Sequence, residues 1–219
     1  MKKIGAITIG QSPRTDVTKD LKEILVDFEL LECGALDEYS YQEVLEKFQP
    51  IDDNLFVSRM RNGKEVLLSK EKIIKELNNC IKKLETRGCS TIIVFCTGEM
   101  TQLKSKARLL KPSILMHKLI PQIANGLKLA IVVPNEKQKA FIKKQWKYTN
   151  IDITMFALSP YEEENALIDL SQKINYQGFN LVYLDCIGYS IKMQQVIKKE
   201  TNLPVILPRT ILAEIAKLI

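Results

Sequence analysis

The sequence has little histidine and few of the residues that break a chain or bias its composition. Its 219 residues include one histidine, nine Gly and eight Pro. The lone His117 excludes a His-rich metal site and any mechanism that needs two histidines. The modest Gly and Pro content, without a repetitive tract, excludes collagen-like and low-complexity chains. We therefore expect an ordinary globular protein without a metal site.

Long apolar runs are also absent. Runs such as Leu181 to Leu184 and Leu129 to Pro134 fall far short of the roughly 18–20 residues that a membrane span needs. The amino-terminal run from Ile4 is interrupted by Thr8 and Gly10, and no small-residue cleavage site follows. We expect a cytoplasmic protein with no membrane contact.

The five cysteines do not form a disulfide pattern. Their number is odd, and no two are spaced as CxxC. In a chain without an export signal, such cysteines are expected to be free thiols. They are Cys33, Cys80, Cys89, Cys96 and Cys186.

The charge is moderately basic but dispersed. The formal net charge of +6 comes from 32 Lys and Arg against 26 Asp and Glu, mixed along the chain. A nucleic-acid-binding protein usually concentrates basic residues on one face of a known module, and no such module or basic block is present. These charges are typical of solvated helix faces. We expect no nucleic-acid partner, and nucleic-acid binding is the weakest alternative.

The hydrophobic pattern predicts an α/β fold. Short β-branched runs alternate with longer segments of helical period, as in parallel sheets with crossover helices. The expected strands are 4–9, 28–33, 91–95, 127–133, 152–156, 180–184 and 204–207. The expected helices are 16–26, 70–87, 136–148, 161–177 and 191–201. Asn62-Gly63, between the apolar segments 57–61 and 65–68, predicts an antiparallel hairpin.

The helix expected at 70–87 has the clearest pattern. Its apolar residues recur at three- and four-residue spacing, which predicts one buried stripe facing a sheet. Gly88 is expected to end this helix in a left-handed conformation. The stripe consists of Ile73, Ile74, Leu77, Ile81 and Leu84.

An internal repeat with a spacing of 90 residues is the most informative feature. Residues 88–98 (GCSTIIVFCTG) align without gaps with residues 178–188 (GFNLVYLDCIG). Each segment consists of a helix-ending Gly, a buried strand and Cys-x-Gly. A weaker similarity pairs residues 7–10 with 131–134. We expect two similar lobes, each with a cysteine at the carboxyl end of a strand.

The position of the two cysteines suggests a functional site. Open α/β sheets bind ligands beyond the carboxyl ends of their strands, so Cys96 and Cys186 should face such a crevice. A helix starting soon after each Cys-x-Gly would favour a thiolate there. The alternative is that these cysteines only pack as small apolar residues. Packing alone gives no reason for the motif to repeat.

Four segments resemble the AroM family, within the aspartate/glutamate racemase superfamily. They are residues 7–16 (ITIGQSPRTD), 34–37 (GALD), 95–98 (FCTG) and 184–188 (LDCIG). The resemblance covers the whole chain and implies two α/β lobes, 1–112 and 113–207, with a ligand cleft between them. Helix 208–219 is expected to be able to pack back onto the first lobe, and a homodimer is a possible assembly.

In the wider superfamily, two cysteines exchange a proton on opposite faces of a carbon α to a carboxylate, without a cofactor. By resemblance, the two bases would be Cys96 and Cys186, with sulfurs about 6–10 Å apart. The substrate would be a small carboxylate or carbonyl compound. Residues implied to contact it are Gly10, Gln11, Ser12, Arg14, Thr97, Gly98, Ile187 and Gly188.

The sequence departs from the amino-acid racemases at several positions. The Asp that precedes Ser in their first loop is missing here, where residues 10–14 read GQSPR. Ile187 and Gly188 stand where those enzymes place Thr and His. An ordinary acidic amino acid is therefore a poor fit, and a substrate without a free amine fits better. Asp185 either acts in the site or caps the following helix.

Other assignments also stay open. The Arg14 fork suits a carboxylate, but the same residue also fits a surface position beside a helix start. Glu99 either acts in the pocket or favours a helix amino terminus, and Arg209 is interpreted as structural. For the whole chain, a two-cysteine racemase or isomerase is expected, with decarboxylase-type chemistry possible. The alternative is a non-catalytic carboxylate-binding protein.

Overall fold

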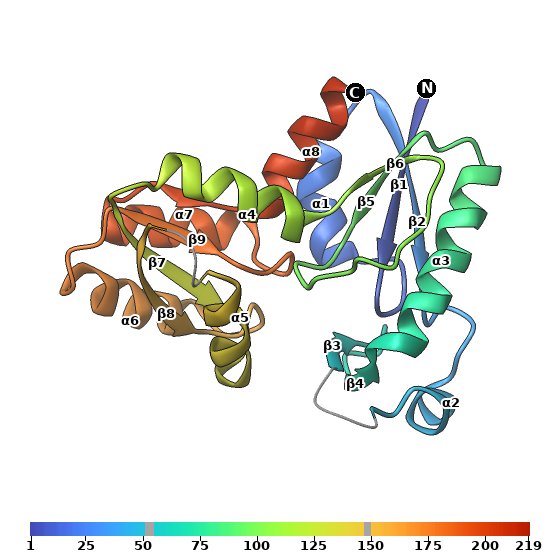
Figure 1. Cartoon of the computed structure of the whole chain (residues 1–219), viewed down its shortest axis with the longest axis horizontal. Coiled ribbons are helices and arrows are strands. Elements are labelled where there is room, and N and C mark those ends of the chain that lie inside the picture. Colours follow the sequence, from blue (N-terminus) through green and yellow to red (C-terminus); the bar gives the residue numbers. More distant parts are fainter. Residues whose placement is uncertain (51–54, 147–149) are drawn as a thin grey trace. The chain divides into compact units, whose positions relative to one another are not determined.

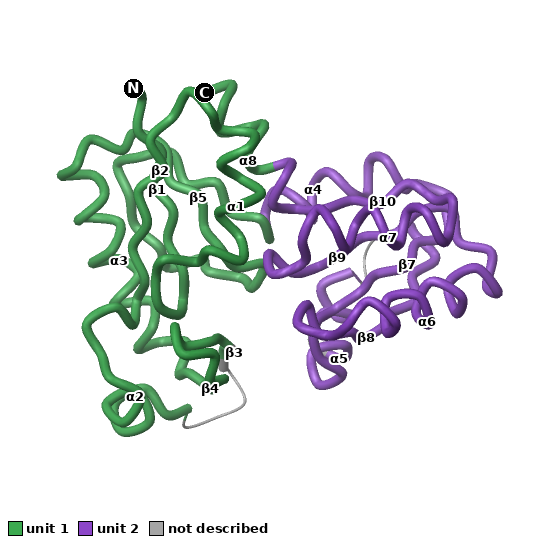
Figure 2. The backbone as a smooth tube through the Cα atoms, turned by 180° about the vertical axis from the view of Figure 1, so that it is seen from behind, with its two compact units in different colours: residues 1–113, 212–219 green, residues 114–211 purple. Residues whose placement is uncertain are grey.

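The chain forms two compact units (Figure 2). The computed structural model describes residues 1–50, 55–146 and 150–219. Unit 1 comprises Met1–Ser113 together with Leu212–Ile219, and unit 2 comprises Ile114–Ile211.

Unit 1 is built on a four-stranded parallel sheet (Figure 1). Its strands are β1 (Lys2–Thr8), β2 (Phe28–Gly34), β5 (Thr91–Val94) and β6 (Arg108–Leu110). Its helices are α1 (Thr15–Ile24), α2 (Tyr41–Lys47) and α3 (Lys70–Thr86). The predicted hairpin is present as β3 (Leu55–Arg59) paired antiparallel with β4 (Glu65–Ser69). Figures 1 and 2 show α3 on one side of the sheet and α1 on the other.

Unit 2 contains a second four-stranded parallel sheet. Its strands are β7 (Lys128–Val133), β8 (Asp152–Ala157), β9 (Leu181–Leu184) and β10 (Val205–Ile206). The helical segments are α4 (Pro112–Ile123), the short η1 (Glu136–Gln138), α5 (Lys139–Gln145), α6 (Glu164–Asn175), α7 (Ile191–Thr201) and α8 (Pro208–Leu218). The first residues of α4 and the last of α8 belong to unit 1.

The two sheets have the same topology. The order is β2-β1-β5-β6 in unit 1 and β8-β7-β9-β10 in unit 2, so each sheet reads second, first, third and fourth strand in chain order. Strand β5 in unit 1 therefore corresponds to β9 in unit 2. These are the strands of the 90-residue repeat, and both are buried along their whole length. The α/β fold with parallel sheets is confirmed.

Helix α3 packs as its sequence predicts. All five residues of the apolar stripe are buried in the core of unit 1. Gly88 follows the helix with φ of +89°, and Gly178 follows α6 with φ of +65°. Both glycines adopt the left-handed conformation that stops a helix just before the corresponding strand.

The core of unit 2 has two layers, one on each face of the sheet. On β7, Leu129, Ile131 and Val133 join one apolar cluster, whereas Ala130 and Val132 join the other. This alternation follows from the two-residue period of a strand. It also explains why β7 is apolar from Leu129 to Val133, as expected for a strand covered on both faces.

Three elements were not expected from the sequence. Helix α2 is only seven residues long, and it is fixed by a capping box in which Ser40 and Glu43 bond to each other's backbone N–H. Strand β6 has three residues and carries little periodicity. Helix α4 contains Pro121, which is unfavourable inside helices.

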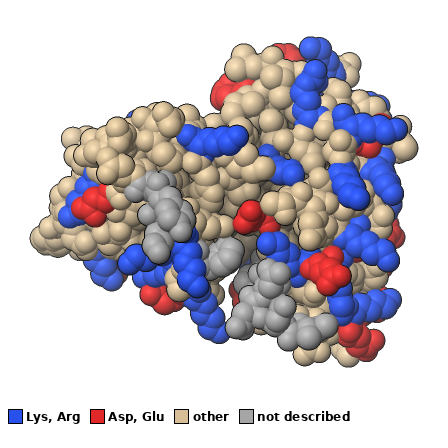
Figure 3. Space-filling model, in the orientation of Figure 1, with Lys and Arg blue, Asp and Glu red and all other residues tan. Residues whose placement is uncertain are grey.

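Two further expectations concern membrane-spanning helices and the distribution of surface charge. None of the helices in the described ranges is long and apolar enough to cross a membrane. On the face drawn in Figure 3, Lys and Arg side chains are interspersed with uncharged surface and with Asp and Glu.

Candidate active site

In unit 1, the loops that follow β1 and β5 begin side by side at the carboxyl edge of the sheet. The two strands are neighbours, with Ile7 paired to Val94. The Phe95 N–H continues the pairing by donating to the Ile7 carbonyl at 2.8 Å. From β1 the chain runs to β2 on one side, whereas β5 lies on the other side of β1. The position between β1 and β5 is therefore the topological switch point, where open α/β sheets bind ligands.

Cys96 lies at this edge and is partly exposed. The backbone N–H of Gly98 points at its sulfur, with an N to Sγ distance of 3.3 Å. An N–H directed at sulfur stabilises a thiolate more than a thiol. A Cβ at position 98 would lie 3.0 Å from the Phe56 ring and 3.3 Å from the Cys96 sulfur. The close approach of Phe56 therefore accounts for glycine at this position.

The β3–β4 hairpin contacts both loops of this edge. A Cβ on Gly10 would lie 2.5 Å from Ser58 Oγ and 2.6 Å from the Arg59 carbonyl oxygen. Phe56 and Ser58, two residues apart on β3, thus pack over Gly98 and Gly10 respectively. Ser58 Oγ is buried and has no hydrogen-bond partner among the described residues.

The loop after β1 is held by polar contacts within unit 1. Asp37 accepts hydrogen bonds from the Ser12 N–H and Ser12 Oγ, both at 2.6 Å. Gln11 donates its side-chain amide to the Leu36 and Tyr39 carbonyls. Arg61 donates its guanidinium to the Ser12 carbonyl at 2.9 and 2.6 Å. Gln11 and Ser12 therefore have structural partners in addition to any ligand contact.

Arg14 stands at the start of α1, where its guanidinium binds Asp16. Nε and Nη2 donate to the two Asp16 carboxylate oxygens at 2.9 and 2.7 Å. Nη1 lies 3.4 Å from Thr8 Oγ1 at the end of β1. The Arg14 guanidinium, predicted to hold a substrate carboxylate, thus holds the Asp16 carboxylate. A ligand at Arg14 must share or displace Asp16.

Unit 2 repeats the cysteine geometry of unit 1. Cys186 follows β9, is partly exposed, and receives the Gly188 N–H with an N to Sγ distance of 3.3 Å. A Cβ on Gly188 would lie 2.9 Å from Cγ of Pro160. Pro160 therefore occupies the position over Gly188 that Phe56 occupies over Gly98 in unit 1.

Asp185 is buried beside Cys186 and is not a helix cap. Ser190 is the residue that caps α7, accepting the Met193 N–H at 3.2 Å. Asp185 instead accepts a hydrogen bond from the Tyr183 hydroxyl at 3.0 Å. Burial and the charge of Asp185 hold the pKa of Tyr183 well above its ordinary value, so this phenol stays protonated. The capping alternative for Asp185 is therefore wrong.

Arg209, in the first turn of α8, also reaches this turn. Its side chain is fully buried, and Nε and Nη2 donate to the Ile187 carbonyl at 2.9 and 2.5 Å. Within the described ranges, Asp185 and Arg209 are the buried charged residues. Both therefore flank the Cys186-Ile187-Gly188 turn.

A helix start soon after Cys-x-Gly, one condition set by the sequence, is met in unit 2 but not in unit 1. In unit 1 no helix lies between Cys96 and β6, which is the next regular element. In unit 2 α7 begins at Ile191, after its Ser190 cap. The N–H donors at the two sulfurs come instead from the glycine two residues after each cysteine. Sequence reasoning missed Phe56, Ser58 and Pro160, whose contacts lie far apart along the chain.

The other three cysteines are buried in the core of unit 1. A hydrogen bond between the Cys33 and Cys80 thiols lowers the pKa of Cys33 and raises that of Cys80, which burial raises further. Burial also raises the pKa of Cys89. Their placement fits the packing role expected for them.

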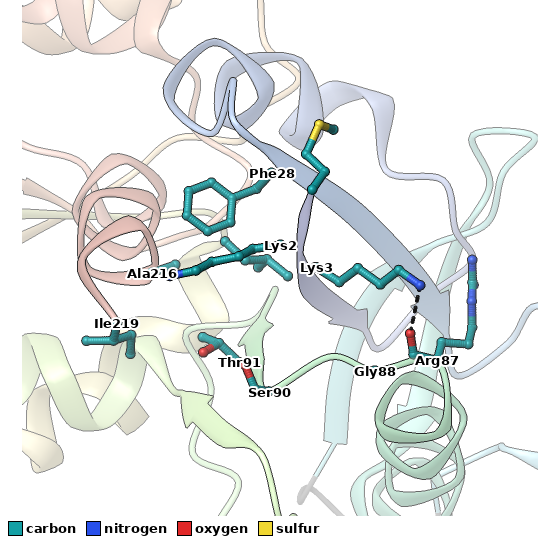
Figure 4. Close-up of a pocket in the computed structure, with 11 residues that line it drawn as sticks. Lys2, Lys3, Phe28, Arg87, Gly88, Ser90, Thr91, Ala216 and Ile219 are labelled. Atoms are coloured by element: carbon teal, nitrogen blue, oxygen red, sulfur yellow. Dashed lines mark hydrogen bonds between the residues drawn. The ribbon is translucent and has the colours of Figure 1, made fainter.

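A cavity of about 400 Å³ in unit 1 lies at the opposite end of the sheet (Figure 4). It is bordered by the amino ends of β1 and β5, where Lys3 Nζ donates to the Arg87 carbonyl at 3.1 Å. Cys96 follows the carboxyl end of β5, so this cavity is separate from the cysteine edge. In the part of the chain that the structure describes, no group of three His, Cys, Asp or Glu side chains is placed to hold a metal ion.

Comparison with known families shows which family the chain belongs to. The model of the AroM protein family matches residues 4–219, so the chain belongs to this family. No curated protein matches it.

Solved structures with a similar fold include racemases, an isomerase and decarboxylases. The aspartate racemase of Picrophilus torridus is 15% identical with a TM-score of 0.58, over 99% of this chain and 93% of that one. Arylmalonate decarboxylase is 12% identical with a TM-score of 0.64, over 100% and 92%. The maleate isomerase Iso from Pseudomonas putida S16 is 11% identical with a TM-score of 0.63, over 97% and 90%. These similarities establish an aspartate/glutamate racemase-like fold.

Proposed function

Starting from membership of the AroM family, we propose that this protein is a cofactor-independent racemase or isomerase. It would act at a carbon α to a carboxylate or related carbonyl group. Cys96 and Cys186 are the proposed acid–base pair. The observation that carries the proposal is their matched environment, because each sulfur follows the corresponding strand and receives the N–H of the glycine two residues on.

The proposed reaction is two proton transfers. One cysteine, as thiolate, takes the α-proton and becomes a thiol, and the electron pair of the broken C–H bond moves into the adjoining carboxylate or carbonyl. The other cysteine, as thiol, then returns a proton to the opposite face and becomes a thiolate. The net charge is unchanged, and the next turnover runs in the reverse sense. Each general acid–base step is typically worth 10²–10⁴-fold.

The remaining donors at the two edges would bind the substrate. In unit 1, Thr97 offers a hydroxyl beside Cys96, while Gly10 and Ser12 lie in the adjoining loop. In unit 2, the buried Ile187 brings no hydroxyl, so the turn has only backbone groups to offer there. A substrate without a free amine is the best fit, because the first loop reads GQSPR at residues 10–14 and lacks the Asp that precedes Ser in the amino-acid racemases.

A second function is favoured by the same Ile187. A turn without a hydroxyl beside Cys186 fits a protein that binds a small carboxylate and does not turn it over. The two functions differ in one observable, which is proton exchange at the α-carbon. Decarboxylation is a further outcome, because it also passes through a carbanion that a cysteine protonates.

The test is hydrogen exchange in deuterated water. The protein is incubated with carboxylic acids, amino acids and hydantoin-like compounds, and α-deuterium and inversion are followed by NMR and chiral chromatography. We expect exchange with inversion for at least one class. Cys96→Ser and Cys186→Ser should each abolish interconversion, whereas Cys80→Ser and Cys89→Ser serve as controls that retain it. Equal activity in all four variants refutes the assignment.

A further inference from the structure

In the part of the chain that the structure describes, the two buried charged residues, Asp185 and Arg209, flank one turn. Burial of a guanidinium is strongly unfavourable unless the hydrogen bonds it made to water are replaced. Arg209 is fully buried, although most of its helix needs only apolar side chains for packing, with Leu212 and Ala213 also buried. Such a group is retained where its charge or its hydrogen bonds serve a purpose that an apolar side chain cannot.

Two hydrogen bonds of Arg209 point to that purpose. Nε and Nη2 converge on one acceptor, the Ile187 carbonyl, at 2.9 and 2.5 Å. Ile187 lies between Cys186 and Gly188, so the carbonyl belongs to the peptide unit whose N–H is that of Gly188. That peptide is planar. Holding the Ile187 oxygen toward Arg209 therefore directs the Gly188 N–H away from Arg209, toward the Cys186 sulfur.

We propose that Arg209 is a positioning residue for Cys186, which orients the Ile187–Gly188 peptide so that its N–H binds the sulfur. The inference deepens the proposed function and rests on it, because Cys186 is taken as one of the two acid–base groups. Arg209 acts through the peptide and not on the substrate. Its placement, at the start of the helix that follows the last strand of unit 2, makes the turn dependent on a residue 23 positions from the cysteine.

Unit 1 provides a matched comparison. Lys111, immediately before α4, donates to the Met100 carbonyl at 3.1 Å in the loop after Cys96. It occupies a similar place at the start of the helix that follows the last strand of the sheet. Its acceptor, however, lies outside the Cys96-Thr97-Gly98 turn. A cation at that point of unit 1 therefore pins the loop without orienting the peptide at the sulfur.

The test measures thiol reactivity and requires no known substrate. Parent, Arg209→Met and Lys111→Met are treated with iodoacetamide from pH 5.5 to 9.5, and alkylation of Cys186 and Cys96 is followed by peptide mass spectrometry. Groups that border the Cys186 turn and also carry charge or titrate are Asp185, Tyr183 and Tyr189, and none is altered. Circular dichroism and thermal unfolding confirm that each variant is folded.

We expect Arg209→Met to move the half-maximal alkylation of Cys186 upward by about one pH unit, a tenfold loss of rate near pH 7. A charge-assisted hydrogen bond to a thiolate is worth about this much. Cys96 in the same molecules should change less than twofold. Lys111→Met should leave Cys186 unchanged. Arg209→Lys should recover part of the shift, because an ammonium keeps the charge but not the fork.

The proposal is overturned if folded Arg209→Met leaves the Cys186 profile where it is, or shifts Cys96 equally. It is also overturned if neither the Met nor the Lys variant folds, since Arg209 then supports the fold as a whole. Because alkylation is independent of turnover, the proposed function can fail in the exchange assay while the Cys186 shift is still seen. Conversely, α-hydrogen exchange can be observed while Arg209→Met leaves the Cys186 alkylation profile unchanged. In that case the positioning role of Arg209 fails and the proposed function stands.

Discussion

The Gly188 N–H lies 3.3 Å from the Cys186 sulfur, the same distance that joins Gly98 to Cys96 in the other unit. Both contacts span two residues and follow the third strand of a sheet with identical topology. The duplicated motif is thus a duplicated geometry, in which glycine supplies an N–H to sulfur while a neighbouring ring covers its α-carbon.

The two glycines should differ in their tolerance of alanine. A methyl group at 188 would lie 2.9 Å from the Pro160 ring, which has little freedom to move, whereas at 98 it would lie 3.0 Å from the edge of Phe56. We expect Gly188→Ala to lower the free energy of unfolding by about 1–3 kcal/mol, as overpacking does. Gly98→Ala should cost less, because the Phe56 side chain can rotate.

Urea denaturation followed by circular dichroism measures this difference. The matched pair serves as its own control, since both changes add the same methyl group beside a cysteine. A smaller loss for Gly188→Ala than for Gly98→Ala would contradict the role given to Pro160.

The five thiols should divide into two groups on native alkylation. At pH 7.5, Cys96 and Cys186 should react with iodoacetamide, because they are the partly exposed cysteines of the described chain. Cys80 and Cys89 should remain unmodified, since their raised pKa leaves them as thiols and they are buried. Cys33 has a lowered pKa but is buried, so the reagent should not reach it.

The measurement is peptide mass spectrometry after a timed quench, with the urea-unfolded protein as the reference for full labelling. Rapid labelling of Cys80 or Cys89 in the folded protein is the result that this assignment does not allow.

Removing the Ser58 hydroxyl should stabilise the protein. The side chain is 9% exposed and its Oγ has no hydrogen-bond partner among the described residues. A buried unsatisfied hydroxyl costs about 1–3 kcal/mol. Ser58→Ala should therefore raise the melting temperature.

Ser12→Ala is the matched control for Ser58→Ala. Ser12 is also 9% exposed, but its hydroxyl donates to Asp37 at 2.6 Å. A hydrogen bond to a charged group contributes about 1.5–3 kcal/mol, so this variant should melt at a lower temperature than the parent. A fall in melting temperature for both variants would show that Ser58 has a partner or a packing role.

Anion binding at Arg14 should respond in opposite directions to two changes. If malonate binds the guanidinium, it competes with Asp16, which holds the same fork at 2.9 and 2.7 Å. Arg14→Ala should then remove most of the malonate-induced rise in melting temperature, and Asp16→Asn should enlarge it. Binding at a hundred times Kd is worth about 2.7 kcal/mol of stability.

Differential scanning fluorimetry with and without malonate gives the shift for each variant. Comparing shifts rather than melting temperatures cancels the helix-terminal contribution of Asp16, which is about 0.3–1 kcal/mol. If Arg14→Ala shows the same malonate-induced rise in melting temperature as the parent, Arg14 does not bind the anion and only holds the start of α1.

Periodicity and the internal repeat predicted most strands, the stripe of α3 and the carboxyl-end position of both cysteines. These features depend on local sequence, because strand burial and helix faces have fixed periods. The contacts that complete the site could not be predicted in this way. Ser58 meets Gly10 and Arg209 meets Ile187 only through tertiary packing. Ser190 rather than Asp185 caps α7 because helix ends depend on local backbone geometry.

The path of the chain through its two units makes unit 1 discontinuous in sequence. Both Met1 and Ile219 belong to unit 1, and unit 2 is one uninterrupted stretch, Ile114–Ile211, inserted into it. A fragment ending at Ser113 would lack Leu212 and Ala216, which are buried in the folded protein. Exchange of unit 2 between family members therefore requires two junctions, and the second falls two residues after Arg209.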